Sequence, residues 1–298
     1  METLESLEKR IRTAEDLLSV VKTMRTMAAA DIRHYERAVA SLSAYERTVS
    51  QALQVVMRER PPGDTIQIPD PELVHGERLG AVVFGSDTGL CGQFNERMAE
   101  HALNKLNGMH VRHQDRTLLT VGNRITHRLQ LAHQPIEAAY AMPTSVKAIG
   151  GAVQSLLLHL DDWQRQRAIR WVLLFYNRKE HETSYAPHME QLLPLDVKWL
   201  EGLRTASWRS RRLPVLFADW ELLLAAFVRQ TMLVALHRAF AESLASENAS
   251  RLAAMQAAER SIGDHLEEFH QVYQLQRQQA ITTELLDIVS GAEAVAEH

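Results

Sequence analysis

Both ends of the chain repeat apolar residues at the spacing of an α-helix. In residues 1–60, apolar positions recur in steps of three or four, with a mean of about 3.5, the period of a coiled coil. They are Leu4, Leu7, Ile11, Ala14, Leu18, Val21, Met24, Ala28, Ile32, Tyr35, Val39, Leu42, Tyr45, Val49, Ala52 and Val56. A helix of this length extends roughly 80–90 Å, too far for a small globular core to cover.

A second stripe near the C-terminus has a mean step of about 3.6 residues. Its members are Ala241, Leu244, Asn248, Leu252, Met255, Ala258, Ile262, Leu266, Phe269 and Tyr273. Asn248 either fixes the register of a seam or is a partly exposed polar residue. Beyond Tyr273 the stripe gives way to glutamines, and a helix that is polar on most faces is solvated or enclosed by other polar surfaces. This is a first hint of a larger assembly.

Prolines and glycines, the strongest helix breakers, are confined to the middle of the chain. All nine prolines lie between Pro61 and Pro214, and residues 1–60 contain neither proline nor glycine. We therefore expect an N-terminal helix over 1–60, a central domain over 61–213 and a C-terminal helix over 214–298. The two helices most simply pair with each other, antiparallel because the central domain returns the chain. The alternative is two unrelated helices that pack separately on that domain.

Three short apolar runs in the middle predict strands, at Ala81–Phe84, Leu118–Val121 and Ile169–Tyr176. Helical patterns lie between them, at Asn95–Leu106 and Ser145–Leu160. Strands that alternate with helices predict a parallel sheet, hence a Rossmann-like α/β domain. The proline-containing segments Pro61–Pro71 and Pro187–Pro214 are interpreted as linkers into and out of this domain; strand order is not predicted.

Composition excludes several classes of protein. The 298 residues are 46% apolar with a formal net charge of −4, which excludes disordered and fibrous chains. Residues 214–298 carry a net charge of about −7, so nucleic-acid binding is not expected there. A single cysteine excludes an internal disulfide framework. The uninterrupted apolar run Leu222–Val228 is far shorter than the roughly 20 residues of a membrane span, and we expect no span and no secretory signal.

The turn from Gly85 to Gly92 follows a predicted strand and precedes a helix, a place where phosphates often bind. Its glycine spacing matches neither the dinucleotide fingerprint nor a P-loop, and Ser86 stands one residue too early for a nucleophile elbow. A tight structural turn, with Asp87 or Asn95 near the helix start, is favoured over a catalytic loop.

The histidines do not form a recognisable metal site. His110 and His113 lack a carboxylate or thiol at ligand spacing, and His181 and His188 fall in a region interpreted as a solvated loop. Cys91 is interpreted as a small turn residue rather than a nucleophile, because no partner base is identified. We predict no metal, no cofactor and no catalytic residue.

Three segments together resemble one family, the gamma subunit of the F-type ATP synthase. They are Val20–Ala30 with its Lys-Thr-Met and Ala-Ala-Ala, the turn Ser86–Asn95, and the C-terminal blocks Ser246–Met255, Arg277–Leu285 and Ile288–Ala292. The matches span the chain in the family's order, and the C-terminal blocks are the most specific.

The resemblance implies a non-catalytic rotor shaft: an antiparallel coiled coil of the terminal helices with an α/β domain between them. It implies that three alpha and three beta subunits surround the coil, and that the domain and the foot of the coil dock on the epsilon subunit and the c-ring. Torque from proton or sodium flow would then drive ATP synthesis or hydrolysis on the beta subunits. The expected location is the cytoplasmic face of a bacterial membrane, as a peripheral subunit.

The resemblance also carries roles to individual residues. Met24 matches the position that faces a beta-subunit loop. Arg251, Arg277 and Gln278 match the polar contacts to the beta-subunit catch loops, and Glu247 matches the acidic neighbour of the first. In the turn, we expect structural roles for four residues: Ser86, Asp87, Gly89 and Gly92.

Several positions depart from the family pattern. They are Thr26, Asp31, Thr88, Gln93, Glu259 and Ser261. The departures suggest a divergent bacterial branch, and one hypothesis is an alternative or sodium-coupled F-type ATPase, although the coupling ion is selected in the c-ring.

Two rival functions stay open at this point. One is a nucleotide-binding α/β enzyme that uses the Gly85–Gly92 turn, which predicts tight ATP binding by the isolated chain. The other is a static helical scaffold, which observation of rotation would exclude.

Overall fold

The structure is a computed structural model that describes residues 3–61, 78–109, 111–181, 184–208, 212 and 214–296. Residue contacts divide the chain into two units, one of Met1–Ala28 with Arg251–His298 and one of Ala29–Ser250. We call them the coil unit and the sheet unit. The long helices α1 (Leu4–Glu59) and α6 (Trp220–Ala296) each contribute residues to both.

The sheet unit is built on a five-stranded mixed sheet of order β3-β2-β1-β4-β5. The strands are β1 (Leu79–Phe84), β2 (Arg116–Val121), β3 (Ile136–Tyr140), β4 (Trp171–His181) and β5 (Ser184–Leu193). β1 pairs in parallel with β2 and β4, β2 pairs in parallel with β3, and β5 runs antiparallel along β4. The predicted α/β class and the three predicted strands are confirmed.

Four shorter α-helices belong to this unit: α2 (Phe94–Gly108), α3 (Asn123–Leu131), α4 (Val146–Gln166) and α5 (Val197–Thr205). A single 3₁₀ turn, η2 (His113–Asp115), precedes β2. The sequence patterns located α2 and α4 and missed α3 and α5, which are only nine residues long. Short helices offer too few turns for a periodic signal.

The interpretation of Pro187–Pro214 as a linker is wrong for much of its length, because β5 and α5 lie within it. Pro187 pairs with Asn177 of β4, and β5 is an edge strand. Proline is tolerated at an edge because the missing N–H donor leaves no neighbouring strand unpaired. The other predicted linker, Pro61–Pro71, lies outside the described residues after Pro61.

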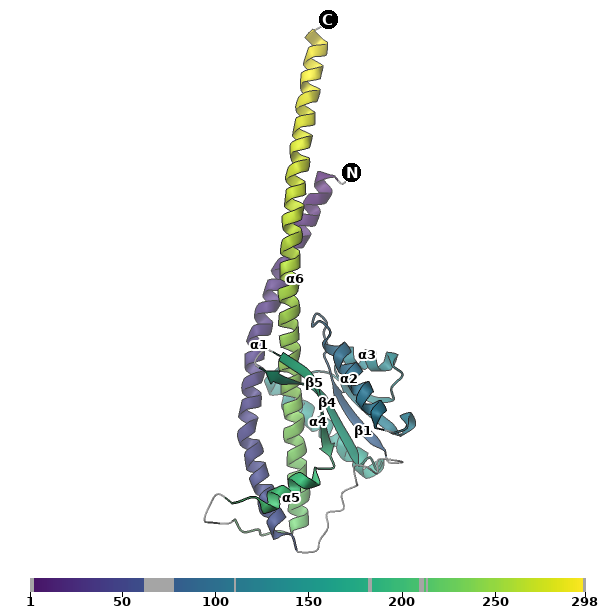
Figure 1. Ribbon diagram of the computed structural model, residues 1–298, viewed down its shortest axis with the longest axis vertical. Helices are drawn as coiled ribbons and strands as arrows, with labels where there is room; N and C mark the ends of the chain where they lie inside the picture. Colours follow the sequence, from purple (N-terminus) through teal and green to yellow (C-terminus); the bar gives the residue numbers. More distant parts are fainter. Residues whose placement is uncertain are drawn as a thin grey trace. The chain divides into compact units, whose positions relative to one another are not determined.

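The two faces of the sheet support two separate cores because successive strand residues point in opposite directions. Ala81 and Val83 face a core completed by α2 and α3. Val82 and Phe84 face a larger core completed by α4, α1 and α6. Figure 1 shows α2 and α3 on one side of the sheet and the two long helices on the other.

The long helices bury their predicted stripes. On α6, every position of the stripe from Ala241 to Tyr273 is at least partly buried. Before the stripe begins, Leu236 and Phe240 are fully buried, and the Phe240 ring meets the Phe84 ring edge-to-face at 4.9 Å between centroids. Along α1, every position of the stripe from Leu4 to Val56 is at least partly buried except Tyr45. In the sheet unit, then, α6 and the stripe of α1 are part of the domain's core.

Asn248 is buried, so the second of its two interpretations, a partly exposed residue, is wrong. It has 7% exposure, and its side-chain nitrogen donates a hydrogen bond to the Leu244 carbonyl 2.9 Å away. The polar group is tolerated in the seam because this bond satisfies one of its donors.

The coil unit pairs the start of α1 with the later part of α6. Leu7, Ile11 and Leu266 form its buried cluster. The pair is antiparallel, because Glu8 contacts Tyr273 whereas Arg25 contacts the earlier residue Glu259. The predicted antiparallel coil is confirmed.

Candidate functional site

The turn after β1 is organised by Asn95, at the beginning of α2. Its side-chain oxygen accepts a hydrogen bond from the Ser86 backbone N–H at 2.9 Å, and its nitrogen donates to Ser86 Oγ at 2.8 Å. Ser86 Oγ in turn donates to the Thr88 carbonyl at 2.8 Å. Ser86 is fully buried and Asn95 nearly so. These bonds hold the serine inside the turn.

Asp87 ties the same turn to two other segments. One carboxylate oxygen accepts from the Asn123 N–H at the start of α3, and the other accepts from the Met142 N–H, each at 2.8 Å. Both carboxylate oxygens therefore accept hydrogen bonds from backbone N–H groups. To accept a proton from a substrate, Asp87 would have to give up one of these bonds. The geometry favours a structural role.

Two glycines in and beside the turn have backbone conformations that other residues rarely adopt. Gly92 has a φ of +57°, in the left-handed region that favours glycine. Gly122, at the start of α3, has a φ of +110°, and a Cβ there would lie 2.8 Å from the Ser86 nitrogen. A Cβ at Gly89 would only touch the Arg124 side chain at ordinary distance. Gly92 and Gly122 are thus required by the backbone, and Gly89 is less constrained.

The other residues that the sequence offered as candidates, a cysteine and several histidines, do not form a site among the residues that the structure describes. Cys91 is buried in the turn, with its sulfur 3.7 Å from Ser86 Oγ. His113 is exposed on η2, and His110 lies outside the described residues. The described part of the chain contains no group of three metal-ligating side chains.

The interpretation of His188 as a solvated loop residue is wrong. It belongs to β5 and its ring packs edge-to-face on Tyr176, with 5.5 Å between centroids. Burial, followed by the charge of Arg178, lowers the pKa of His188. The backbone of His181 is the last position of β4, and its side chain lies outside the described part of the structure.

The five predicted contact residues on the long helices do not form one cluster. Met24 is partly buried on α1 of the coil unit, and Arg251 is partly buried on α6. Arg277 and Gln278 are exposed further along α6. Glu247 belongs to the sheet unit and is only 6% exposed.

The charge of Glu247 also affects Tyr35 of α1. Burial is the largest cause that raises the pKa of Tyr35, followed by the charges of Asp31 and Glu247.

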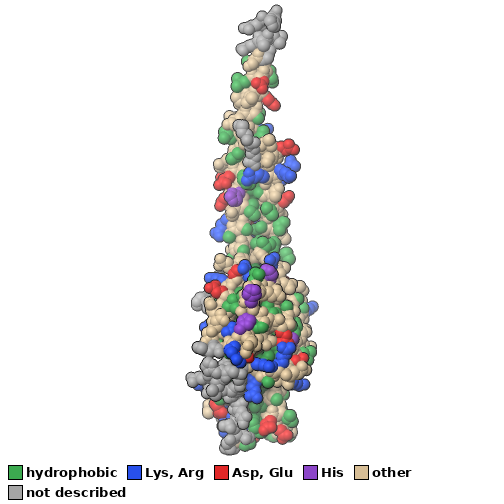
Figure 2. Space-filling view, turned by 90° about the vertical axis from the view of Figure 1, so that its right-hand side faces the viewer, with side chains coloured by type: hydrophobic (Ala, Val, Ile, Leu, Met, Phe, Trp, Pro, Cys, Tyr) green, Lys and Arg blue, Asp and Glu red, His purple; other side chains and the backbone are tan. Residues whose placement is uncertain are grey.

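The part of α6 beyond Tyr273 exposes a row of large apolar side chains among its glutamines. They are Leu275, Ile281, Leu285, Leu286, Ile288 and Val289. Figure 2 shows hydrophobic side chains at the surface of this end of the helix beside few charged ones. Exposed apolar surface of this extent is typical of a region that another protein covers.

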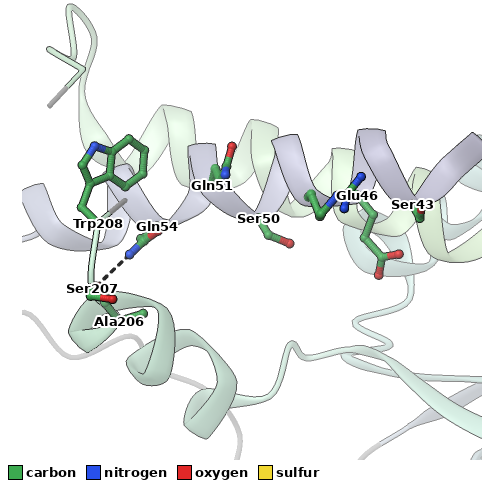
Figure 3. A pocket seen from close by; sticks show the side chains of 9 residues that line it. Ser43, Glu46, Ser50, Gln51, Gln54, Ala206, Ser207 and Trp208 are labelled. Atoms are coloured by element: carbon green, nitrogen blue, oxygen red, sulfur yellow. Dashed lines mark hydrogen bonds between the residues drawn. The ribbon is translucent and has the colours of Figure 1, made fainter. Parts of the chain in front are cut away.

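A polar groove of about 840 Å³ lies between α1 and the segment Ala206–Trp208. Figure 3 shows Ser43, Ser50 and Gln51 along it, with Gln54 donating to the Ala206 carbonyl at 2.9 Å. Neither this groove nor the 260 Å³ pocket beside Glu190 includes any residue of the Gly85–Gly92 turn. The pockets therefore give no support to an enzyme built on that turn.

One cluster of charged residues in the structure was not predicted from the sequence. Arg238 of α6 bonds Glu46 of α1 and Glu190 of β5. The available signal was an arginine between the apolar residues Leu236 and Phe240, a position where a charge needs partners. Its partners lie 192 and 48 residues away in the sequence, so they could not be named from it.

By length and composition alone, part of α6 is apolar enough to cross a membrane. The uninterrupted apolar run Leu222–Val228 is too short to reveal this stretch, because Arg229 and Gln230 follow it. A single such helix is weak evidence, since core helices of soluble proteins meet the same criterion. Leu236 and Phe240 of this helix are fully buried in the sheet unit.

Comparison with known proteins accounts for this combination of fold and surfaces. The family model of the ATP synthase matches residues 3–295. The chain belongs to the ATP synthase gamma-chain family. The ATP synthase gamma chains of a Nostoc species and of Paracoccus denitrificans are each 28% identical to it, over 99% of this chain and the whole of the relative.

Solved structures agree on the fold of the family. A chain of the mitochondrial ATP synthase of Euglena gracilis, from the part with OSCP, F1 and c-ring, superposes with a TM-score of 0.67 at 17% identity. The match covers 98% of this chain and 94% of that one. A chain of the rotor of the same enzyme gives a TM-score of 0.64 at 16% identity. The chain of the gamma-chain family thus has the same fold as these ATP synthase chains.

Proposed function

We propose that the chain is a non-catalytic shaft whose coil unit contacts the catalytic beta subunits in succession as it turns. The observation that carries the proposal is the family match over nearly the whole chain, joined to the exposed apolar and polar surface of α6 beyond Tyr273. Different faces of an asymmetric shaft bind three equivalent subunits differently, and differential contact is what changes their nucleotide affinities.

The proposed beta-subunit contacts are those that the family pattern assigns. Arg277 and Gln278 are exposed on α6 and free to meet partner carboxylates and backbone groups, for which arginine's fork of donors is suited. Met24 and Arg251 are partly exposed. Glu247 is buried within the sheet unit, which favours a supporting role for it over direct contact.

The remaining partners follow from the same assignment. We propose three alpha and three beta subunits around the coil, with the epsilon subunit and the c-ring against the sheet unit and the foot of the helices. The location is then the cytoplasmic face of the membrane. The chain itself does not cross the membrane in this proposal, because its apolar helix α6 contributes Leu236 and Phe240 to a protein core.

Met24→Lys in the assembled complex tests the contact assignment. A lysine facing a beta-subunit loop changes the interaction between rotor and beta subunit, so ions pumped per ATP hydrolysed should fall while the complex stays assembled. Met27→Lys is the matched control, since Met27 is 61% exposed on the same helix and carries no assigned contact. Equal pumping ratios in the parent and Met24→Lys would contradict the assignment.

The shaft role itself is tested by direct observation of rotation. A probe on the sheet unit should rotate when ATP is added to the complex with immobilised beta subunits. A static scaffold would give no rotation under conditions in which the complex hydrolyses ATP. Tight ATP binding by the isolated chain in calorimetry would instead support the enzyme alternative.

A further inference from the structure

Arg238 joins three elements of the sheet unit. It projects from α6, and its Nη1 donates to Glu46 Oε1 of α1 at 2.8 Å. Its Nη2 donates to Glu190 Oε1 of β5 at 2.6 Å. The Arg238 and Glu190 side chains are 21% and 24% exposed. A single guanidinium therefore links both long helices to the sheet.

The connection continues from Glu190 into the middle of the sheet. The second Glu190 oxygen accepts a hydrogen bond from the Tyr176 hydroxyl of β4 at 2.7 Å. Tyr176 is fully buried, and its ring packs edge-to-face on Phe84 of β1. Burial, followed by the charge of Glu190, raises the pKa of Tyr176. The hydroxyl therefore remains a donor, and the bonded path runs from α6 to the central strands.

The charge on the arginine is maintained. Burial alone lowers the pKa of Arg238, but the negative charges of carboxylates, first Glu190 and then Glu46, outweigh it and raise the pKa overall. Arginine suits this place because its planar fork presents two donors to two carboxylates at once. A lysine offers a point charge with no fixed fork.

Among the described residues, three other ion pairs also link the long helices to the domain, and all differ from Arg238 in kind. Arg178 of β4 meets Glu242 of α6 at 3.9 Å, with the arginine 51% exposed. Arg229 of α6 meets Asp161 of α4 at 3.1 Å, with the arginine 50% exposed. Lys179 of β4 meets Glu36 of α1 at 2.6 Å, with both side chains more than one third exposed. Each joins only two elements, and solvent screens exposed pairs so that they contribute little.

We infer that Arg238 is the positioning residue through which the sheet of the α/β domain holds the two long helices against twist. The inference rests on the rotor role: torque that enters a shaft through its domain must pass to the helices through whatever connects them. Apolar packing resists separation of the layers but is non-directional. Directional, charge-assisted bonds to two elements resist sliding and rotation of α6 over the sheet.

The test separates the two bonds of Arg238 with isosteric variants. Glu190→Gln weakens the link from helix to sheet, and Glu46→Gln weakens only the link between helices. Asp161→Asn is the matched control, because it weakens another arginine contact from α6 to the domain. A Leu158→Cys substitution gives an exposed attachment point on α4, and the native Cys91 is buried, so a probe can be attached selectively.

The measurement is the angular fluctuation of that probe in the assembled complex, with rotation stalled by a non-hydrolysable ATP analogue. Angular variance is inversely related to stiffness, and charge-assisted bonds are roughly twice as strong as neutral ones. Glu190→Gln is therefore expected to widen the variance, by at most about twofold, because other contacts share the load. Glu46→Gln should widen it less, and Asp161→Asn should leave the parent value unchanged.

Two outcomes overturn the inference. One is an unchanged variance in Glu190→Gln, even if its melting temperature falls, since that makes Glu190 only a stabilising residue. The other is an Asp161→Asn variance as wide as that of Glu190→Gln. The parent complex is first tested for ATP-driven rotation, so failure of the rotor role is seen separately as absence of rotation in the parent.

Discussion

The coil unit and the sheet unit solve the problem of burying apolar surface in opposite ways. The sheet unit has a core on each face of the sheet, with Trp163, Tyr176 and Phe240 fully buried. The described part of the coil unit has one small cluster around Leu7, Ile11 and Leu266. Much of its remaining apolar surface lies exposed beyond Tyr273.

Polar contacts supplement the thin core of the coil unit. Arg25 pairs with Glu259 at 2.7 Å, Tyr273 donates to Glu8 at 2.6 Å, and the Arg10 guanidinium stacks 4.4 Å from the centre of the Phe269 ring. Such contacts fix register, but partly exposed ones add little stability. The difference teaches that the sheet unit buries its apolar residues in cores of its own, whereas the coil unit leaves many of them exposed.

The largest expected effect is in the core of the sheet unit. Phe240→Ala removes a fully buried ring that packs on Phe84, and should lower the free energy of unfolding by about 3–5 kcal/mol. Urea denaturation of the purified chain measures it. Phe217→Ala is the control, because Phe217 is 98% exposed, and it should change stability by less than about 0.5 kcal/mol. Similar losses in both variants would mean that the described core does not govern stability.

The next effect should remain local to the coil unit. Leu7→Ala removes a side chain that is 1% exposed, at a local cost of about 2–5 kcal/mol. Because the pair has little other core, hydrogen exchange should lose protection along the start of α1 while the strands keep theirs. Leu17→Ala, at a 53% exposed position of the same helix, should change nothing. Loss of protection in the sheet would contradict independent units.

An exposed residue of the coil unit should matter for assembly and leave the isolated chain unaffected. Arg277→Ala is expected to weaken formation of the complex by about 1.5–3 kcal/mol, the value of a charged hydrogen bond. Titration of the chain into alpha and beta subunits measures it. Arg260→Ala, also exposed on α6, serves as control. Equal assembly by both variants and the parent would remove Arg277 from the contact set.

Glu242 gives the sheet unit a pH dependence. Burial is the largest cause that raises the pKa of Glu242, and the charges of Arg178 and Arg238 oppose it only in part. The folded state therefore resists ionisation of this carboxyl more than the unfolded chain does, so stability is lost as the pH rises above the ordinary pKa of 4.5.

Glu242→Gln should accordingly stabilise the chain at neutral pH by an amount on the order of 1 kcal/mol. The gain should shrink as the pH falls and disappear below 4.5, where the native carboxyl is protonated in both the folded and the unfolded state. Thermal melts at a series of pH values measure it, with Glu221→Gln at an exposed position as control. Destabilisation at neutral pH would show that the charge is favourable there.

The smallest effect concerns the polar supplement of the coil unit. Glu259→Gln weakens the contact to Arg25, whose side chain is 42% exposed, and should cost only about 0.2–1 kcal/mol. The difference should disappear at roughly 1 M salt, where charges are screened within about 3 Å. Persistence of the loss in high salt would point to packing as its cause.

Strands with both faces buried were predictable, and those at the sheet edges were not. β1, β2 and β4 are central and read as continuous apolar runs, because side chains on both faces enter a core. β3 and β5 are edge strands in which polar residues such as Glu137 and His188 alternate with small or apolar ones. Their pairing depends on neighbours that lie far away in the sequence.

The Gly85–Gly92 turn also combines features that could be predicted from the sequence with others that could not. Its glycines and Ser86, Asp87 and Asn95 could be singled out because they are turn-forming residue types between a strand and a helix. The backbone partners of Asp87, Asn123 and Met142, lie 36 and 55 residues away and follow no local pattern. The structural role of the aspartate was predicted, but its partners became visible only in the folded chain.

By itself, the sequence determined two unbroken helices, an α/β domain between them and the family to which the chain belongs, and it favoured antiparallel pairing of the helices. These follow from local periodicity and from motifs that persist along the chain. Only the tertiary structure decided the strand order, the burial of Asn248 and Glu247, and the meeting of Arg238 with Glu46 and Glu190. The physical reason is that the partners of a charged residue lie far away in the sequence and come within hydrogen-bonding distance only in the folded chain.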